Sequence, residues 1–502
     1  MRAHTAMRAH TTIALIVAAG CASHGVERRQ ATATAATAAA KPVVADPEAW
    51  RAQAPPLKSM APYSPPTVVH TTLANGIPLY VVENRRTPIV AVRLVVRAGS
   101  AAVGSEQAGL PALVARTVVS GAAGSHSADA LANELAKLGA STDASTTRDA
   151  SFLSMEVLRD ALAPALDRFA DLVLRPALAA DEVARARDEL AAELRRRATE
   201  PMSAAEDALR RISYGPAHAY AASDLGTATT LDKLTPKDVA ALHRRLWRPR
   251  NLALIVAGDI DVASAKALLD ARFGGWKDAG AHGTPPSLPL PPPSRARRVV
   301  LIDRPHARQA VVALGGLSPP RRADEWSALT VMNTVFGYDY ASRLSLKLRE
   351  ASGFTYSIRS RLIPSVGAGQ LMVRAGIALE KTASALRAIF AEMDAMRAQP
   401  PAPAELEAAR QASAQSLASR LETDVDVAAL VADAFIFALP DDFLSRTIGA
   451  LGSISAMDVR AAAVELLRHE TMPVIVVGPA QQLEPQLRAA GLGDVELLRT
   501  AD

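Results

Sequence analysis

Two side chains in the later part of the chain, Arg349 and Tyr356, have the chemistry to bind a peptide backbone. A guanidinium and a phenol are hydrogen-bond donors, and such donors stabilise a peptide carbonyl oxygen as it gains negative charge. Residue types alone favour a plainer interpretation, in which Arg349 pairs with Glu350 or a neighbouring helix and Tyr356 caps a strand in the core. The motif around the two residues, described below, favours substrate binding.

The segment 109–117 and the glutamate at position 193 resemble the zinc-binding segments of the insulinase/pitrilysin-like metallopeptidases. That family carries an inverted H-x-x-E-H motif after Gly-Leu-x, and a glutamate 76 residues later completes the metal site. The resemblance puts Ala112, Ala115 and Arg116 at the three motif positions. Because 76 residues separate Arg116 from Glu193, Glu193 falls at the third-ligand position.

These replacements remove the metal chemistry. Zinc takes imidazole, thiolate or carboxylate ligands, and a catalytic site needs three of them and a water. Ala112 and Ala115 have no donor atoms, and the guanidinium of Arg116 repels a dication. No two histidines stand three or four positions apart in the sequence. We therefore predict no catalytic residue and no bound zinc in this chain. Glu193 is then either solvated on an Arg-rich helix or, as we expect, paired with Arg116.

The segment 341–357 resembles a second stretch of the same family, Ser-Arg-Leu followed by Leu-Arg-Glu-x-x-Gly-Leu-x-Tyr-Ser. The resemblance implies that Arg349 and Tyr356 lie opposite the zinc and hold the substrate backbone. The family's Gly-rich approach to this stretch is replaced by 336–340, Phe-Gly-Tyr-Asp-Tyr. These aromatic side chains predict a narrower cavity.

This chain lacks the zinc motif and keeps the Arg/Tyr pair. In this combination it resembles the non-catalytic subunits of the bacterial processing-peptidase-like branch of this family. The resemblance therefore implies a subunit that is inactive alone and supports zinc metalloendopeptidase activity in a heterodimer. Zinc and an intact H-x-x-E-H would come from the catalytic partner, and peptides would be the substrates. The alternative is a peptide-binding or scaffold lipoprotein without a catalytic role.

The elements that position these residues form two similar units. An apolar run opens each unit, at 88–96 and 309–314, and another closes each unit at Gly258 and Gly478. Short apolar runs alternate with amphipathic helical patterns in both. The pattern predicts an α+β fold with two homologous domains, each a mostly antiparallel sheet covered by helices. The resemblance implies that the pair forms one half of a clamshell. Typical predicted elements are strands over 151–157 and 370–377 and helices over 161–174 and 404–422.

A length of 502 residues exceeds what one hydrophobic core organises, which agrees with two domains. Composition and Pro-rich breaks set their predicted limits. The predicted organisation is a lipoprotein signal peptide (1–21), an Ala/Thr/Pro-rich tether (22–66), an N-terminal domain with the degenerate zinc motif (67–280), a Pro-rich linker (281–297), a C-terminal domain with the Arg/Tyr motif (298–482) and a C-terminal tail (483–502).

The N-terminus predicts export. Arg2 and Arg8 precede a short apolar run, 11–19, that ends near Cys21, the only cysteine. This pattern resembles a bacterial lipoprotein signal, in which the cysteine is lipidated; an ordinary signal peptide is the alternative. We expect a membrane-anchored lipoprotein of the bacterial cell envelope that faces the periplasm, without internal disulfides. The net charge of +5 is partly carried by this tail and indicates no nucleic-acid partner.

Overall fold

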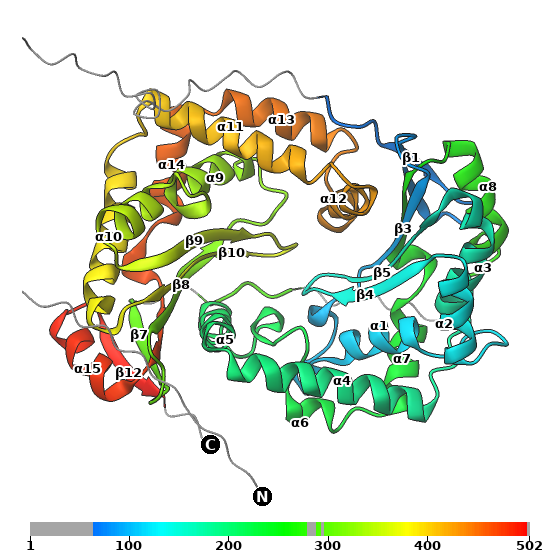
Figure 1. Cartoon of the computed structure of the whole chain (residues 1–502), viewed down its shortest axis with the longest axis horizontal. Coiled ribbons are helices and arrows are strands. Elements are labelled where there is room, and N and C mark those ends of the chain that lie inside the picture. The colour runs from blue at the N-terminus through cyan, green and yellow to red at the C-terminus, as the bar shows by residue number, and fades with distance from the viewer. Residues whose placement is uncertain (1–63, 279–287, 293–295, 499–502) are drawn as a thin grey trace, which may run out of the picture. The chain divides into compact units, whose positions relative to one another are not determined.

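The computed structural model describes residues 64–278, 288–292 and 296–498. Two α+β units follow each other in this part of the chain, called here the first half (64–278) and the second half (296–498) (Figure 1). The predicted signal peptide with Cys21 lies outside the described residues, as do most of the predicted tether and linker.

Each half contains one six-stranded sheet. The strands of the first sheet are β1 (Val69–Thr72), β2 (Pro78–Glu83), β3 (Ile89–Val96), β4 (Ser141–Thr146), β5 (Ser151–Leu158) and β6 (Leu252–Gly258). The strands of the second sheet are β7 (Arg298–Asp303), β8 (Ala310–Ser318), β9 (Thr355–Ile363), β10 (Gly369–Ile377), β11 (Val474–Gly478) and β12 (Asp494–Leu498). The central strands β6 and β11 are buried along their whole length, as expected of apolar runs with packed layers on both faces.

The strand order is the same in both sheets at five of six positions. The first sheet runs β1-β2-β6-β3-β5-β4 and the second β12-β7-β11-β8-β10-β9. In each, the closing strand pairs parallel with the first long strand and antiparallel with the next one. Gly258 and Gly478 end the two equivalent closing strands. The predicted α+β class with two homologous domains is confirmed.

The sixth strand differs between the sheets. In the first sheet β1 pairs antiparallel with β2, and in the second sheet β12 pairs parallel with β7. The second sheet therefore takes its outer strand from 494–498, within the segment that the sequence analysis had assigned to a C-terminal tail. That assignment is corrected here, because α15 (Ala480–Ala489) and β12 complete the second domain.

Helices cover one face of each sheet and enclose the two main cores. In the first half they are α1 (Leu110–Ser120), α2 (Ala128–Lys137), α3 (Leu162–Leu174), α4 (Ala180–Thr199), α5 (Pro201–Tyr214), α6 (Ala228–Leu231), α7 (Pro236–Leu246) and α8 (Val262–Phe273). In the second half they are α9 (Trp326–Asn333), α10 (Thr382–Ala398), α11 (Pro403–Ser419), α12 (Asp424–Phe437), α13 (Phe443–Ser453), α14 (Ala456–Leu466) and α15. The predicted elements at 151–157, 370–377, 161–174 and 404–422 correspond to β5, β10, α3 and α11.

Side-chain caps fix where several of these helices begin. Thr235, Asp261, Thr423 and Ser455 each accept a hydrogen bond from a backbone N–H in the first turn of the helix that follows. Such a cap satisfies a donor that the helix itself leaves unpaired and contributes about 1 kcal/mol. The caps occur in both halves, so local sequence signals set helix starts throughout.

One helix from each half packs on the sheet of the other half. Helix α12 covers the second face of the first sheet, where Val431 and Phe435 contact β3 and β6 (Figure 1). Helix α5 covers the second face of the second sheet, where Leu209 packs against β8 and β11. Because each sheet needs an apolar layer on both faces, the two halves complete each other's cores.

Within the residues that the structure describes, no helix combines the length and apolar character needed to cross a membrane.

Candidate functional site

Helix α1 carries the three positions of the degenerate zinc motif. It begins after Gly109, whose φ of +92° is left-handed and whose Cβ, if present, would lie 2.6 Å from the carbonyl oxygen of Leu225. Ala112 and Ala115 follow on the inner face of the helix, 6% and 2% exposed, and belong to the core of the first half. Both motif positions are thus occupied by small apolar core residues.

Arg116 forms two ion pairs with the adjacent helix α4. Its Nη1 lies 3.5 Å from Oε2 of Glu189, and its Nη2 lies 3.5 Å from Oε2 of Glu193. The expected pairing of Arg116 with Glu193 is present in the structure. Sequence reasoning missed Glu189, although its position one helical turn before Glu193 was the signal that could have found it.

This arrangement does not fit a zinc ion. Ala112 and Ala115 offer no ligand atom, and the carboxylate of Glu193 already faces a guanidinium rather than an open position. A metal at this place would meet the positive charge of Arg116 instead of two imidazoles. The side chains present therefore satisfy one another and provide no ligand set for metal-assisted hydrolysis.

Arg349 and Tyr356 lie together in the second half. Arg349 belongs to the π-helical segment η8 (Ser345–Ala351), and Tyr356 is the second residue of β9. Gly353, with a left-handed φ of +59°, turns the chain between them. The guanidinium carbon of Arg349 lies 5.4 Å from the centroid of the Tyr356 ring, a cation–π contact.

The exposure of Tyr356 contradicts one part of the plainer interpretation, and an ion pair of Arg349 agrees with the other part. Tyr356 is 87% exposed, so it is not a core residue that caps a strand. Arg349 does meet Glu350, with 3.4 Å between Nε and Oε1, and this exposed contact contributes little stability. A large exposed aromatic ring beside an incompletely paired guanidinium is available to a ligand.

Two further residues extend the pair into a stack. The guanidinium carbon of Arg359 lies 3.7 Å from the ring centroid of Tyr340, and that of Arg349 lies 5.3 Å from the same ring. Tyr340 is 62% exposed, so this aromatic residue lies on the surface beside Arg349. Sequence reasoning had noted Tyr340 only as a bulky residue, and no motif signalled Arg359.

A partly buried ion pair anchors the segment just before η8. The Nε and Nη2 atoms of Arg343 lie 2.6 Å and 2.8 Å from the two carboxylate oxygens of Glu405, and its Nη1 lies 3.4 Å from Oε1 of Glu392. The hydrogen bonds from Arg343 hold the pKa of Glu405 below its ordinary value. Bidentate geometry fixes the orientation of the guanidinium, so Arg343 positions the chain that presents Arg349.

The free edge of the first sheet lies beside the degenerate motif. Strand β4 is the last strand of its sheet, and it packs against α1. Its side chains are small or polar, and Ser141, Asp143 and Ser145 are exposed. An edge strand of this kind presents backbone donors and acceptors that an extended peptide is able to pair with. Between the α1–α4 group and the Arg349 group, no hydrogen bond, ion pair or ring contact joins the described residues.

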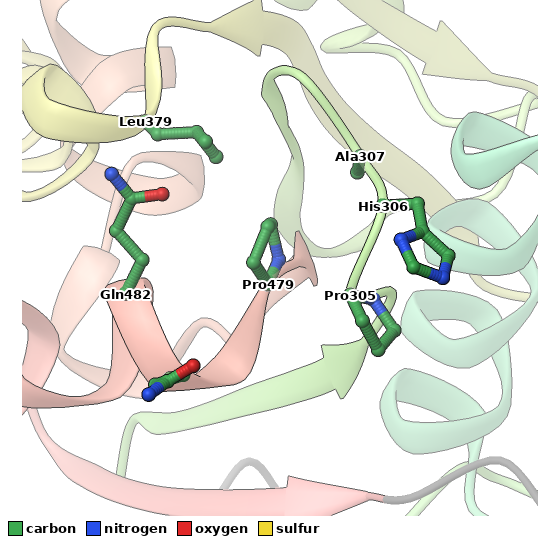
Figure 2. A pocket seen from close by; sticks show the side chains of 7 residues that line it. Pro305, His306, Ala307, Leu379, Pro479 and Gln482 are labelled. Carbon is green, nitrogen blue, oxygen red and sulfur yellow. The ribbon is translucent and has the colours of Figure 1, made fainter.

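One cavity of the described surface lies away from both groups. A cavity of about 540 Å³ is lined by the loop 305–307, Leu379, Pro479, Gln481 and Gln482. Figure 2 shows Leu379 and Gln482 on one side of it and Pro305 to Ala307 on the other. Its lining offers one imidazole and two amides but no carboxylate. None of the predicted site residues contributes to it.

Two family models match the chain. The model described as "Insulinase (Peptidase family M16)" matches residues 79–222, and the model described as "Peptidase M16 inactive domain" matches residues 233–413. The first match covers most of the first half. The second match covers the end of the first half and much of the second half.

Individual proteins agree with these matches. An uncharacterized zinc protease of Mycobacterium tuberculosis is 28% identical over 257 residues, which is 51% of this chain and 58% of that protein. The chain thus spans about 58% of the length of this curated relative. A peptidase M16 inactive domain from Pseudomonas fluorescens has a TM-score of 0.76 at 23% identity, covering 82% of this chain and 98% of that one. A protease from Helicobacter pylori has a TM-score of 0.77 at 20% identity, with 82% and 100% covered.

Proposed function

Since this chain belongs to the insulinase family, peptidase family M16, we propose that it is a non-catalytic subunit of a zinc peptidase complex. The resemblance seen in the sequence to that family is confirmed. In the proposed complex, a catalytic partner with an intact H-x-x-E-H motif holds the zinc and hydrolyses peptides. This chain contributes Arg349 and Tyr356 to substrate binding.

One observation carries the proposal. At the metal motif, Arg116 forms ion pairs with both Glu189 and Glu193, so neither carboxylate is left without a cationic partner. The residues of the Arg/Tyr motif remain accessible, because Tyr356 is exposed and stacks on Arg349. A chain without a metal site of its own, but with accessible donors at Arg349 and Tyr356, is suited to bind a substrate that a partner subunit hydrolyses.

The described surface also supports peptides as the ligand class. The edge of β4 offers backbone hydrogen bonds to an extended chain, which requires no particular side-chain sequence. Arg349 and Tyr356 offer donors to carbonyl oxygens. Both features suit the peptide backbone, which supports peptides as the proposed substrate class.

The proposal includes a place for the complex. The short apolar run before Cys21 supports export and attachment of the chain to a bacterial membrane by a lipid on that cysteine. The complex would then work in the cell envelope, on the periplasmic side.

The test is peptide hydrolysis with measured zinc content. The purified chain is assayed alone and then with an insulinase-family polypeptide from the same genome that carries an intact H-x-x-E-H. We expect no zinc and no hydrolysis from the chain alone, and hydrolysis in the mixture above that of the partner by itself. The variants Arg349→Ala and Tyr356→Ala should lose this gain, whereas Arg446→Ala, an exposed arginine on α13 paired with Asp442, should keep it.

Two results would contradict the proposal. Zinc-dependent hydrolysis by the chain alone would mean that the degenerate motif is not the determinant of its metal chemistry. Peptide binding without any gain in hydrolysis with a catalytic partner would favour the alternative function, a peptide-binding or scaffold lipoprotein.

A further inference from the structure

The exposed aromatic rings of the described residues lie close together in the sequence. Within the part of the chain that the structure describes, Tyr338, Tyr340 and Tyr356 are the only exposed residues among the phenylalanines, tyrosines and tryptophans. The others in this part are buried or half-buried. Exposed rings gain little from core packing, so their concentration around Arg349 indicates a surface that contacts another molecule.

Tyr340 is the ring that two arginines contact. The guanidinium carbon of Arg359 lies 3.7 Å from the centroid of the Tyr340 ring, and that of Arg349 lies 5.3 Å from it. Among the described arginines, Tyr356 contacts Arg349 alone. Tyr340 also stands where the insulinase family has a Gly-rich segment, so its contact with Arg349 belongs to this chain and not to the family pattern.

The backbone around Tyr340 is held in place by its own neighbours. Before it, the hydroxyl of Tyr338 forms a hydrogen bond of 2.9 Å with the hydroxyl of Ser416 on α11. After it, the N–H of Ser342 donates to the carbonyl oxygen of Asp339 at 3.2 Å. The carboxylate of Asp339 accepts the N–H of Tyr340 itself. These bonds fix the chain on both sides of Tyr340, so the ring is in position before a ligand binds.

Contact with a ring leaves the hydrogen-bond donors of a guanidinium free. The N–H groups of arginine lie in the plane of the group, whereas a cation–π contact uses the flat face of that plane. Glu350 approaches only the Nε of Arg349, at 3.4 Å. No hydrogen bond or ion pair joins the Nη atoms of Arg349 to another described residue. These N–H groups remain available to the carbonyl oxygens of a peptide.

The ring contact also lowers the entropy that Arg349 would lose on binding. A long arginine side chain has many rotamers in solution, and fixing it on a ligand removes that freedom. A side chain that already rests against a ring has lost part of this freedom in the free protein. Binding is then stronger for the same hydrogen bonds, which is the general effect of preorganisation.

We infer that Tyr340 is a positioning residue, which holds the guanidinium of Arg349 where its N–H groups meet the backbone of a bound peptide. This inference rests on the proposed peptide-binding function and deepens it. It adds to the Arg349 and Tyr356 pair a third residue that acts through Arg349 and not by a contact of its own with the peptide.

The test measures binding of a decapeptide of Ala, Ser and Thr residues, acetylated and amidated at its ends, to the full chain by calorimetric titration. This peptide has no charged or aromatic group, so its binding reports contacts with the backbone. Tyr340→Leu removes the ring and should weaken Kd about two- to fivefold, the factor that one exposed cation–π contact supplies. Tyr340→Phe keeps the ring and should leave Kd unchanged.

A double-mutant cycle separates positioning from direct contact. If Tyr340 acts through Arg349, Tyr340→Leu should have no further effect in a chain that already carries Arg349→Ala. The urea midpoint of Tyr340→Leu should equal that of the natural chain, because the ring is largely exposed. Met457→Ala, at an exposed apolar residue of α14, is the control and should leave Kd unchanged.

Several results would overturn the inference and leave the proposed function intact. One is weaker binding in Arg349→Ala with an unchanged Kd in Tyr340→Leu. Another is an equal loss in Tyr340→Leu and Tyr340→Phe, which would assign the effect to the hydroxyl. A loss that persists in the Arg349→Ala chain, or that comes with a lower urea midpoint, would assign Tyr340 to direct binding or to the fold.

Two other results would overturn the inference and the proposed function together. They are absence of peptide binding by the natural chain and binding that Arg349→Ala leaves unchanged. Both proposals depend on donors of Arg349 that recognise the peptide backbone, and neither result is compatible with such donors.

Discussion

Arg116 in the first half and Arg349 in the second belong to homologous α+β units, yet their surroundings are opposite. Arg116 on α1 forms ion pairs with two carboxylates on α4. The inner face of α1 carries Ala112 and Ala115, which belong to the core. Arg349 has one exposed acidic neighbour and two exposed tyrosine rings. The first arrangement is complete without a ligand, and the second leaves donors available for one.

This difference separates the residues that the packing of the fold explains from those that it does not explain. The helices α1 and α4 pack together without metal ligands, because Ala112 and Ala115 are themselves buried in the core. Arg349 and Tyr356 have no such structural task, since their side chains lie outside the core to which the neighbouring Leu348 belongs.

Restoring the motif would test the comparison most strongly. The variant Ala112→His/Ala115→Glu/Arg116→His supplies two imidazoles next to Glu193, so we expect about one zinc per chain with a Kd below about 1 μM, against no measurable binding in the natural chain. Calorimetric titration and metal analysis measure this. Adding Glu193→Gln should weaken zinc binding by at least about tenfold; unchanged affinity would show that Glu193 is not at the third-ligand position.

The interlocking of the halves can be tested at α12. Phe435 packs against the first sheet, and the guanidinium carbon of Arg97 lies 3.9 Å from its ring centroid. Phe435→Ala should lower the unfolding free energy by about 3–5 kcal/mol, because it leaves a cavity between the halves. Urea unfolding measures the loss. Phe435→Leu serves as the control and should cost less than half as much; equal stability of both variants to the natural chain would mean that α12 does not contribute to the first core.

A pH series would sharpen the comparison within the first half. Burial lowers the pKa of His243 on α7 to about 4, below the value of about 6.5 in an unfolded chain. Its neutral form is thus favoured by folding, and this stability is present above about pH 6.5 and lost as the pH falls toward 4. The loss should amount to about 2–3 kcal/mol. His243→Phe keeps a ring against Trp247 and should reduce this slope in urea unfolding at pH 7, 5.5 and 4. Identical slopes would contradict the prediction.

The smallest effect concerns Arg116 itself. Its pairs are partly exposed and 3.5 Å long, so Arg116→Ala should cost below about 1 kcal/mol of unfolding free energy. Arg343 in the second half is the matched comparison, because its bidentate pair with Glu405 is shorter and less exposed. Arg343→Ala should cost about 2 kcal/mol by the same measurement. A larger loss for Arg116 than for Arg343 would reverse this ranking of the two halves.

Local and repeated signals made much of the fold predictable. The apolar runs that end at Gly258 and Gly478 marked equivalent central strands, because a buried strand must be apolar wherever it occurs. The edge strand β12 was missed, since its alternating pattern of partial burial over five residues is weak. In the candidate site, spacing found the pairing of Arg116 with Glu193, but it could not find Arg359, whose partner Tyr340 is 19 positions earlier in the sequence.

The sequence by itself determined the loss of the metal site, because alanine has no ligand atom and arginine stays charged in any fold. It also determined the duplication and the spacing of Arg349 and Tyr356. Only the tertiary structure decided that α5 and α12 each pack on the sheet of the other half and that Tyr356 is exposed. The packing of α5 and α12 depends on contacts between residues more than a hundred positions apart. The exposure of Tyr356 depends on which elements pack over it. Local sequence spacing sets neither of these.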